Sequence, residues 1–321
     1  MTYAIGAAAR LAFKKEVTYG TNPGGTDFLQ MPFIPPMRFG ADQALIDSNV
    51  IGIGPTRDAS DPFYDGINVP INFAVPLDKT ELGRWLQLLC GAPTTTGSSN
   101  YTHVFKSGGL SLPSATLELG HPGLTTPQYF LATGVRADTL EINCQPTGQA
   151  QAALTFIAQA CARSGTTVDA SLTAPASYEQ FNNFQASIER AGSPLAAITQ
   201  CNLRFANGLE ALRTIRGDQK IDEALPGGVT VGGTLTARFG DDALVLEADA
   251  EGTSSIALKL TWTISATKLL EISLPRVFLP QKLKEVGGRA GVDVNYEFRA
   301  AYDASAGAAF VATLKNQTAS Y

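Results

Sequence analysis

The chain has 321 residues, of which 44% are hydrophobic and 8% aromatic, so it can bury a substantial core and is not disordered as a whole. Its 24 lysines and arginines face 29 aspartates and glutamates, and the net charge of −5 argues against a protein that holds nucleic acid through a basic surface. No apolar run reaches the length of about 18 residues that a membrane span needs, so we expect a soluble product without membrane insertion.

Motifs for metal binding or catalysis are missing from the sequence. The four cysteines lack C-x-x-C spacing and there are only two histidines, and neither a nucleophile elbow, a P-loop nor a dinucleotide fingerprint is present. Asp58, Asp61 and Asp65 lie close together but lack the glycine and distal glutamate of a calcium loop. We therefore expect no catalytic residue, no metal site, no cofactor and no enzyme activity.

The first predicted elements are strands. The 31 glycines and 18 prolines separate short runs rich in Val, Ile, Leu, Thr and Phe, which is typical of a mainly β protein. Alternation of apolar and polar residues predicts half-buried antiparallel strands. The clearest are Ile67–Val75, Ala153–Ile157, Val229–Val231 and Val292–Phe298.

One segment has helical spacing. In Asp78–Leu89, the residues Leu82, Trp85 and Leu86 fall on one face, which predicts an amphipathic helix. Asp78 is placed to cap the first turn, with Glu81 reaching back as in a capping box. The helix should end before the sequence Cys90-Gly91-Ala92-Pro93, because glycine and proline stop helices.

An internal repeat is the most informative feature. The segment that starts at Gly66 resembles the segment that starts at Gly228, and both read as a strand followed by an acid-capped helix start. We therefore predict two tandem β-sandwich domains, residues 1–165 and 166–321, each flanked by one helix. The polar stretch Thr94–Asn100 and its flanking hairpin would be extra residues in the first copy. A chance likeness between two sandwiches with similar turns is the alternative.

The order of several weak features resembles a protein family. The opening contains Glu16-Val17-Thr18-Tyr19-Gly20-Thr21 and continues as an extended segment through Pro32, Pro35 and Pro36. A charged loop at Arg57-Asp58, the strand after Gly66 and the capped helix follow. In this order the chain resembles the tail tube proteins of long-tailed bacteriophages with flexible, non-contractile tails. The second half lacks a counterpart of Glu-x-x-x-Gly-Thr, which leaves an immunoglobulin-like appendage open for that half.

The resemblance implies a structural virion protein. Its expected fold is a β-sandwich of two antiparallel sheets flanked by a helix, with a long loop that reaches the neighbouring ring. Tail tubes commonly have six such domains per ring, so a duplicated chain would form a homotrimeric ring with pseudo-sixfold symmetry. The rings would stack into a tube that passes double-stranded DNA. Expected partners are further copies of the chain and the tape measure, tail terminator and distal tail proteins. The location would be the virion tail, after assembly in the host bacterial cytoplasm.

Charged loops are the candidates for contacts between rings, because loops carry contacts on an otherwise compact scaffold. The loops are Thr56–Asp65 and Arg213–Glu223. The candidate residues in them are Arg57, Asp58, Asp61, Tyr64, Arg213, Arg216, Asp218 and Asp222. In the N-terminal arm, the candidates for subunit contacts are Lys14, Glu16 and Tyr19.

Residues on the polar face of a strand are candidates for the inner wall of the tube. Asp293, Asn295 and Glu297 alternate with apolar residues. If they face the lumen, an acidic wall would let DNA slide rather than bind. The alternative is that they lie on the outer surface.

Two other classes of protein remain open on the sequence. Another virion component, such as a tail terminator or decoration protein, would have a similar composition. A carbohydrate-binding or hydrolytic β-sandwich would need an exposed aromatic platform or a pair of carboxylates. Trp85 and Trp262 are candidates for such a platform, although the position of Trp85 on the apolar helix face favours the core.

Overall fold

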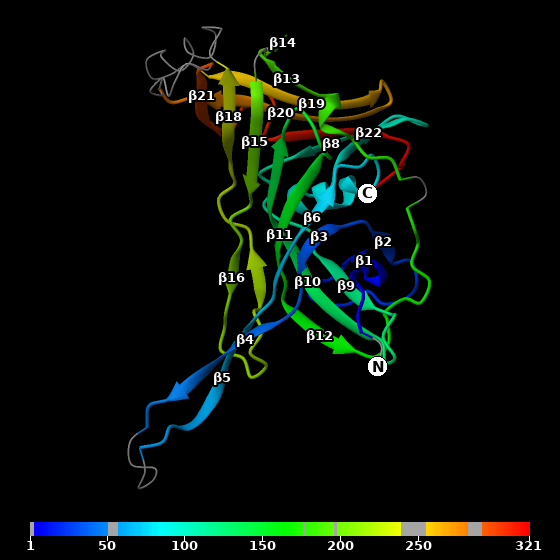
Figure 1. Ribbon diagram of the computed structural model, residues 1–321, viewed down its shortest axis with the longest axis vertical. Coiled ribbons are helices and arrows are strands. Elements are labelled where there is room, and N and C mark those ends of the chain that lie inside the picture. The colour runs from blue at the N-terminus through cyan, green and yellow to red at the C-terminus, as the bar shows by residue number, and fades with distance from the viewer. Residues whose placement is uncertain (1–2, 51–56, 176–177, 196–197, 239–254, 282–290) are drawn as a thin grey trace.

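The structure is a computed structural model that describes residues 3–50, 57–175, 178–195, 198–238, 255–281 and 291–321. Antiparallel strands dominate these residues, and one α-helix, α1 (Leu82–Cys90), occurs among them. The prediction of a mainly β fold is confirmed. Figure 1 shows a body of sheets from which two hairpins project at one end.

The described part of the first half contains twelve strands and a short 3₁₀ turn, η1 (Gly6–Ala8). The strands are β1 (Arg10–Lys15), β2 (Leu29–Met31), β3 (Ile34–Arg38), β4 (Asp42–Ser48), β5 (Ser60–Asn68), β6 (Pro70–Pro76), β7 (Thr94–Thr96), β8 (Tyr101–Lys106), β9 (Ala115–His121), β10 (Gln128–Cys144), β11 (Gln151–Ile157) and β12 (Ala160–Ser164).

The described part of the second half contains ten strands and the 3₁₀ turn η2 (Asn183–Gln185). The strands are β13 (Ala186–Arg190), β14 (Ser193–Pro194), β15 (Ile198–Ala206), β16 (Glu210–Leu212), β17 (Glu223–Leu225), β18 (Thr230–Arg238), β19 (Ile256–Ser265), β20 (Lys268–Phe278), β21 (Asp293–Ala300) and β22 (Val311–Asn316).

The strands of the two halves pair in the same order. In the first half β2 pairs with β1, β1 with β9, β9 with β10, and β10 with both β12 and β11; β11 then pairs with β6 and β6 with β3. In the second half β14 pairs with β13, β13 with β19, β19 with β20, and β20 with both β22 and β21; β21 then pairs with β18 and β18 with β15. Each half also has a separate hairpin, β4–β5 or β16–β17.

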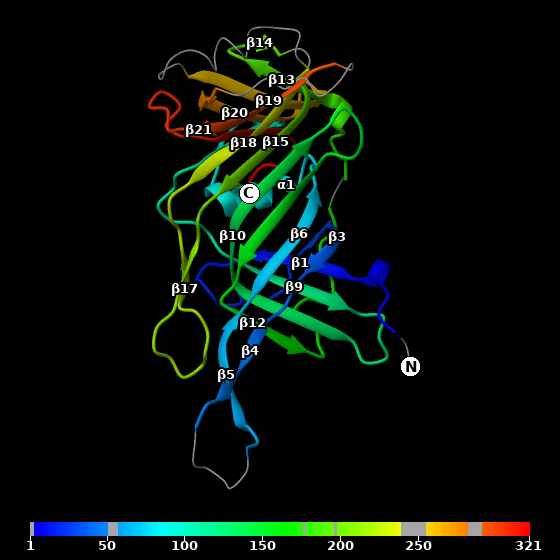
Figure 2. The same cartoon turned by 60° about the vertical axis from the view of Figure 1, so that its left-hand side comes forward.

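Hydrogen bonds between strands also join the halves. β10 pairs with β15, which gives the continuous order β3-β6-β11-β10-β15-β18-β21-β20, and β8 pairs with β22. Figure 2 shows β6, β10, β15 and β18 side by side. The predicted boundary after residue 165 lies between β12 and β13, but strands from both sides of it share one sheet. The division into two domains stays a prediction.

Helix α1 closes the core of the first half. The rings of Phe13 and Phe73 meet the Trp85 ring edge-on at 5.4 and 5.5 Å, and Phe156 lies 5.6 Å away. The predicted apolar face is therefore buried. The helix begins at Leu82, four residues later than predicted, because the backbone N–H groups of Thr80 and Glu81 donate to the Asp78 carboxylate in a turn before it.

The predicted reach-back of Glu81 is not observed. Its Oε2 atom is buried without a hydrogen-bond partner, and burial, together with the charge of Asp78, raises the pKa of Glu81 to about 7. The helix ends where predicted, because Gly91 takes a positive φ of 91° that favours glycine.

Three predictions of local structure were wrong. The run Ile67–Val75 is not one strand: it divides at buried Val69 between hairpin strand β5 and sheet strand β6, because the chain changes pairing partner there. The predicted loop 56–65 is strand from Ser60 onward. Within the predicted loop Thr94–Asn100, the residues Thr94–Thr96 form β7, which pairs with β8. The helix start predicted in the second copy, after residue 240, lies outside the described residues.

Candidate functional site

The candidate contact surfaces are two hairpins and one face of the large sheet. Figures 1 and 2 show β4–β5 and β16–β17 leaving the same end of the body, with β4–β5 reaching farther. The two hairpins are counterparts in the pairing order, because each follows the last strand in the order of its half, β3 or β15.

Hairpin β16–β17 is bound to the first half of its own chain. The Arg136 guanidinium donates to the Ala224 carbonyl and forms an ion pair with Glu223 at 2.8 Å. Arg136 also lies 4.6 Å from the centre of the Tyr19 ring, and the Tyr19 hydroxyl accepts the Ala224 N–H. Gln159 donates to the carbonyl of the residue before Glu223. Burial raises the pKa of Tyr19, so the phenol stays protonated.

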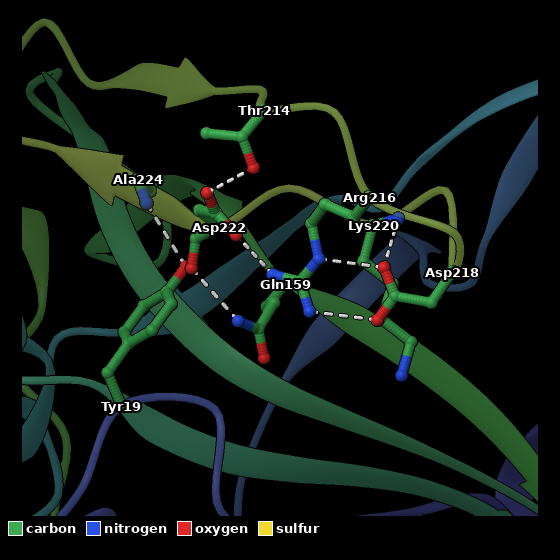
Figure 3. A network of polar contacts seen from close by, with 8 residues as sticks. All are labelled: Tyr19, Gln159, Thr214, Arg216, Asp218, Lys220, Asp222 and Ala224. Atoms are coloured by element: carbon green, nitrogen blue, oxygen red, sulfur yellow. Dashed lines mark hydrogen bonds and ion pairs between the residues drawn. The ribbon is translucent and has the colours of Figure 1, made fainter.

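The tip of this hairpin holds four residues predicted for ring contacts. Arg216 lies between Asp218, at 2.8 Å, and Asp222, and Thr214 donates to Asp222 (Figure 3). The hydrogen bond from Arg216 lowers the pKa of Asp218, and the hydroxyl of Thr214 is the main cause that lowers the pKa of Asp222. The predicted loop is a loop up to Asp222, with Glu223 already in β17, and Arg216, Asp218 and Asp222 pair with one another within it.

The tip of β16–β17 also contacts the base of the other hairpin. Arg213 donates to the Ile67 carbonyl and to the Asn68 side chain. The Gln219 carbonyl accepts the Ile67 N–H, and its side chain accepts from Gln43. The loop Arg213–Glu223 is therefore held against the base of β4–β5, just beyond the predicted loop Thr56–Asp65.

Hairpin β4–β5 is exposed over most of its length. Arg57 and Asp58 precede β5, whereas Asp61 and Tyr64 lie within it, and all four are exposed. Two cross-strand pairs, Leu45 with Tyr64 and Ile46 with Phe63, place four large apolar side chains in water. Residues 51–56, including Thr56 of the predicted loop, lie outside the description.

The predicted N-terminal contact residues bind within the chain. Glu16 is buried, and its carboxylate accepts hydrogen bonds from Ser114, Thr116 and the N–H groups of Gly20 and Gly134. The Lys14 ammonium donates to the carbonyls of residues 24 and 26, and Tyr19 contacts β17 as described above. A role of these three side chains between subunits stays a prediction.

The predicted lumen residues lie on the polar face of the large sheet. Asp293, Asn295 and Glu297 alternate with buried residues along β21. Asp293 pairs with Arg238 at 2.9 Å, and Thr236 donates to Asn295. On this face, β15, β18, β21 and the part of β10 that pairs with β15 expose three carboxylates and three guanidinium groups. These are Glu141, Asp293, Glu297, Arg204, Arg238 and Arg299. The chain's net charge of −5 is not concentrated there, so this face is polar rather than acidic.

The described residues offer little for catalysis or metal binding. They contain no group of three or more His, Cys, Asp or Glu side chains placed to hold a metal ion. Burial raises the pKa of Cys90 to about 12 and that of Cys144 and Cys161 to about 11, which keeps these thiols protonated. Trp262 is fully buried like Trp85, so neither forms an exposed aromatic platform.

Arg136 and Gln159 were missed in the sequence because nothing near them marks a contact. Arg136 lies in the middle of the long strand β10 and Gln159 lies between β11 and β12, and only the fold places them under β17. No described helix has the length and apolar character that a membrane span requires.

The fold and the surfaces thus define a β-sheet protein whose distinctive features are projecting hairpins and a broad polar sheet face. A family model described as phage tail tube protein matches residues 6–300, so the chain belongs to the phage tail tube family. A comparison with curated proteins found no match. The resemblance predicted from the sequence is confirmed. The chain is a structural tail tube protein, and its family places it in the virion tail.

Proposed function

We propose that three copies of this chain close into a ring with pseudo-sixfold symmetry and that the rings stack into the tail tube of a phage with a non-contractile tail. The observation that carries this proposal is the repeated pairing order, in which seven strand pairings recur in the second half. Two domains, residues 1–165 and 166–321, would then occupy equivalent places around the ring.

The size of the sheet supports a tube of suitable bore. Each half supplies four strands to the continuous order, β3-β6-β11-β10 and β15-β18-β21-β20. Three chains would supply twenty-four strands, which at about 4.8 Å spacing give a circumference near 115 Å and a backbone diameter of roughly 37 Å. A duplex about 20 Å wide passes such a bore after side chains narrow it.

Electron microscopy of the purified, concentrated protein tests the ring. We expect tubes whose averaged cross-section has three chains and six similar lobes. Discrete particles without tubes would contradict the tube, and six chains around the axis would contradict the trimer while leaving the tube intact.

We assign the polar sheet face to the lumen, with Asp293, Asn295 and Glu297 on the wall. Its balanced charge supports passage of DNA without tight binding, because duplex DNA binds where cationic groups neutralise its phosphates. Reversing two charges together, Asp293→Lys with Glu297→Lys, should slow DNA release from assembled particles. Unchanged release would place these residues on another surface, and the neutral pair Asp293→Asn with Glu297→Gln is the control.

Stacking of rings is assigned to the hairpin tips, which project in one direction (Figure 1). A head-to-tail contact that does not close on itself produces a filament. Surface ion pairs contribute well under about 1 kcal/mol each, so Arg57, Asp58 and the tip of β16–β17 would fix the register of the rings rather than supply most of the stability. The tape measure, tail terminator and distal tail proteins are the other proposed partners, with assembly in the host cytoplasm.

A further inference from the structure

The two hairpins correspond residue by residue. Arg38 of β3 pairs with Asn72 of β6, and Asn202 of β15 pairs with Thr234 of β18. In the first half, Ile46 lies eight residues after Arg38, and Phe63 lies nine residues before Asn72. In the second half, Glu210 lies eight residues after Asn202, and Leu225 lies nine residues before Thr234. Ile46 pairs with Phe63, and Glu210 pairs with Leu225. The pair Ile46–Phe63 of β4–β5 therefore corresponds to the pair Glu210–Leu225 of β16–β17.

This correspondence identifies the face of β4–β5 that matches the bound face of β16–β17. Ala224, which exchanges hydrogen bonds with Tyr19 and Arg136, is fully buried. Its counterpart is Pro62. Neighbouring residues of a strand point to opposite faces. Ala224 points away from the face of Leu225, and Tyr64, with its partner Leu45, points away from the face of Phe63, so Tyr64 and Leu45 lie on the matching face. Tyr64 is 66% and Leu45 58% exposed, although the equivalent face in the second half is covered.

The surface that receives a hairpin also has a counterpart in the second half. The N–H of Gln159, just after β11, donates to a carbonyl of β10, and the N–H of Ala301, just after β21, donates to the Arg276 carbonyl of β20. Two residues before them, Ile157 pairs with Arg136 and Arg299 pairs with Phe278. Phe278 therefore occupies the position of Arg136.

The surfaces around Arg136 and around Phe278 differ in chemistry, and each suits the side chains of a different hairpin. The guanidinium of Arg276 lies 5.2 Å from the Phe278 ring. Tyr302, which is 63% exposed, directly follows Ala301, whose N–H donates to the Arg276 carbonyl. The first-half surface is polar and holds the acidic strand β17. The second-half surface is aromatic, and the hairpin whose matching face is exposed carries Tyr64 and Leu45. An isolated two-stranded hairpin is marginally stable in water, which favours a partner for it.

We propose that the Leu45, Pro62 and Tyr64 face of hairpin β4–β5 docks on the surface around Arg276, Phe278 and Tyr302 of the neighbouring copy in the same ring. The inference rests on the proposed self-assembly and names the surfaces that close the ring. The proposed contact would repeat between chains the contact that β16–β17 makes with the first half of its own chain. The tip of β4–β5 stays available for the next ring.

Cysteine cross-linking tests this contact in assembled protein. In a Cys161→Ser background, which removes the partly exposed thiol, Tyr64→Cys chains are mixed with Tyr302→Cys chains, assembled and mildly oxidised. We expect a disulfide-linked dimer on a non-reducing gel. The matched control replaces Tyr64→Cys with Phe63→Cys, because Phe63 points to the opposite face of the same strand and should link at least about tenfold less.

A chain with both Tyr64→Cys and Tyr302→Cys determines whether the contact lies within a ring. A closed ring of three gives covalent trimers as the largest product. A ladder beyond the trimer would place the contact between rings and overturn the assignment. Tubes without the cross-link would overturn this contact while the proposed tube stands. Absence of tubes and rings from the unmodified protein would overturn both.

Discussion

Hairpins β16–β17 and β4–β5 occupy equivalent places in the two halves but have opposite surroundings. The first is bound by Arg136, Tyr19 and Gln159 of its own chain. The second holds Tyr64 and Leu45 in water. The same supersecondary unit therefore has one face covered by the body of the chain in one half, whereas the described contacts of the other hairpin, with Arg213 and Gln219, lie at its base. This difference shows how a duplicated chain can form an interface within itself in one half and leave the equivalent face of the other half exposed for a second chain.

The largest effect should come from Arg136→Met. This change removes the bond to the Ala224 carbonyl, the ion pair with Glu223 and the contact with the Tyr19 ring, at a buried position. We expect the unassembled protein to lose about 2 to 4 kcal/mol of unfolding free energy, measured by urea denaturation.

Arg276→Met is the matched control in the second half. Arg276 is exposed, so its loss should change the stability of the unassembled protein by less than about 0.5 kcal/mol while weakening assembly. Equal losses of stability from both variants would remove the distinction between the two hairpins.

Tyr19→Phe should have a smaller effect. It leaves the ring beside Arg136 but removes the hydroxyl that accepts the Ala224 N–H at 3.1 Å. An unsatisfied backbone donor costs about 1 kcal/mol, and hydrogen exchange at Ala224 should accelerate to match. Unchanged exchange there would show that the hydroxyl does not hold β17.

Acid should loosen only the bound hairpin. The pKa values of Asp218 and Asp222 are lowered in the folded chain, so their contribution is present above the unfolded value of about 3.8 and is lost as pH falls further. Between pH 5 and pH 3 we expect the protection factors of residues 213–222, which correct for the intrinsic slowing of amide exchange in acid, to fall. Those of β4–β5, whose pairs Leu45–Tyr64 and Ile46–Phe63 are apolar, should change little. In Asp218→Asn the pH response should shrink, and an undiminished response would assign it to other groups.

Gly66→Ala should produce the smallest change. A Cβ atom at Gly66 would lie 2.4 Å from the Nη1 atom of Arg213, which reaches across from the other hairpin. The end of a long side chain can move, so we expect a loss of about 0.5 kcal/mol or less in thermal unfolding. A loss above about 1 kcal/mol would show that Arg213 is a fixed link between the hairpins.

The sequence predicted well those features that depend on local periodicity. The helix around Trp85, the alternating strand with Asp293 and Glu297, and the charged tip with Arg216 all appear where the pattern placed them. It was wrong at Ile67–Val75, because uninterrupted alternation does not show where a chain exchanges one strand partner for another.

The clearest trace of the repeat in the sequence lies around Gly66 and Gly228. The pairing order extends the correspondence to every strand of each half except β7 and β8, for which the described residues of the second half contain no counterpart. Pairing depends on backbone hydrogen bonds that many side chains permit, so topology persists where the likeness between side chains has faded.

Composition, period and turn residues by themselves determined that this chain is mainly β and that it has a helix around Trp85. The resemblance to tail tube proteins rested on the order of several weak features along the chain. Only the tertiary structure decided that Glu16 is buried, that Arg136 and Gln159 hold β17, and that Tyr64 on the matching hairpin has no such cover. The reason is that local patterns fix which face of a strand is apolar, whereas the identity of the surface it meets depends on residues 63 to 205 positions away.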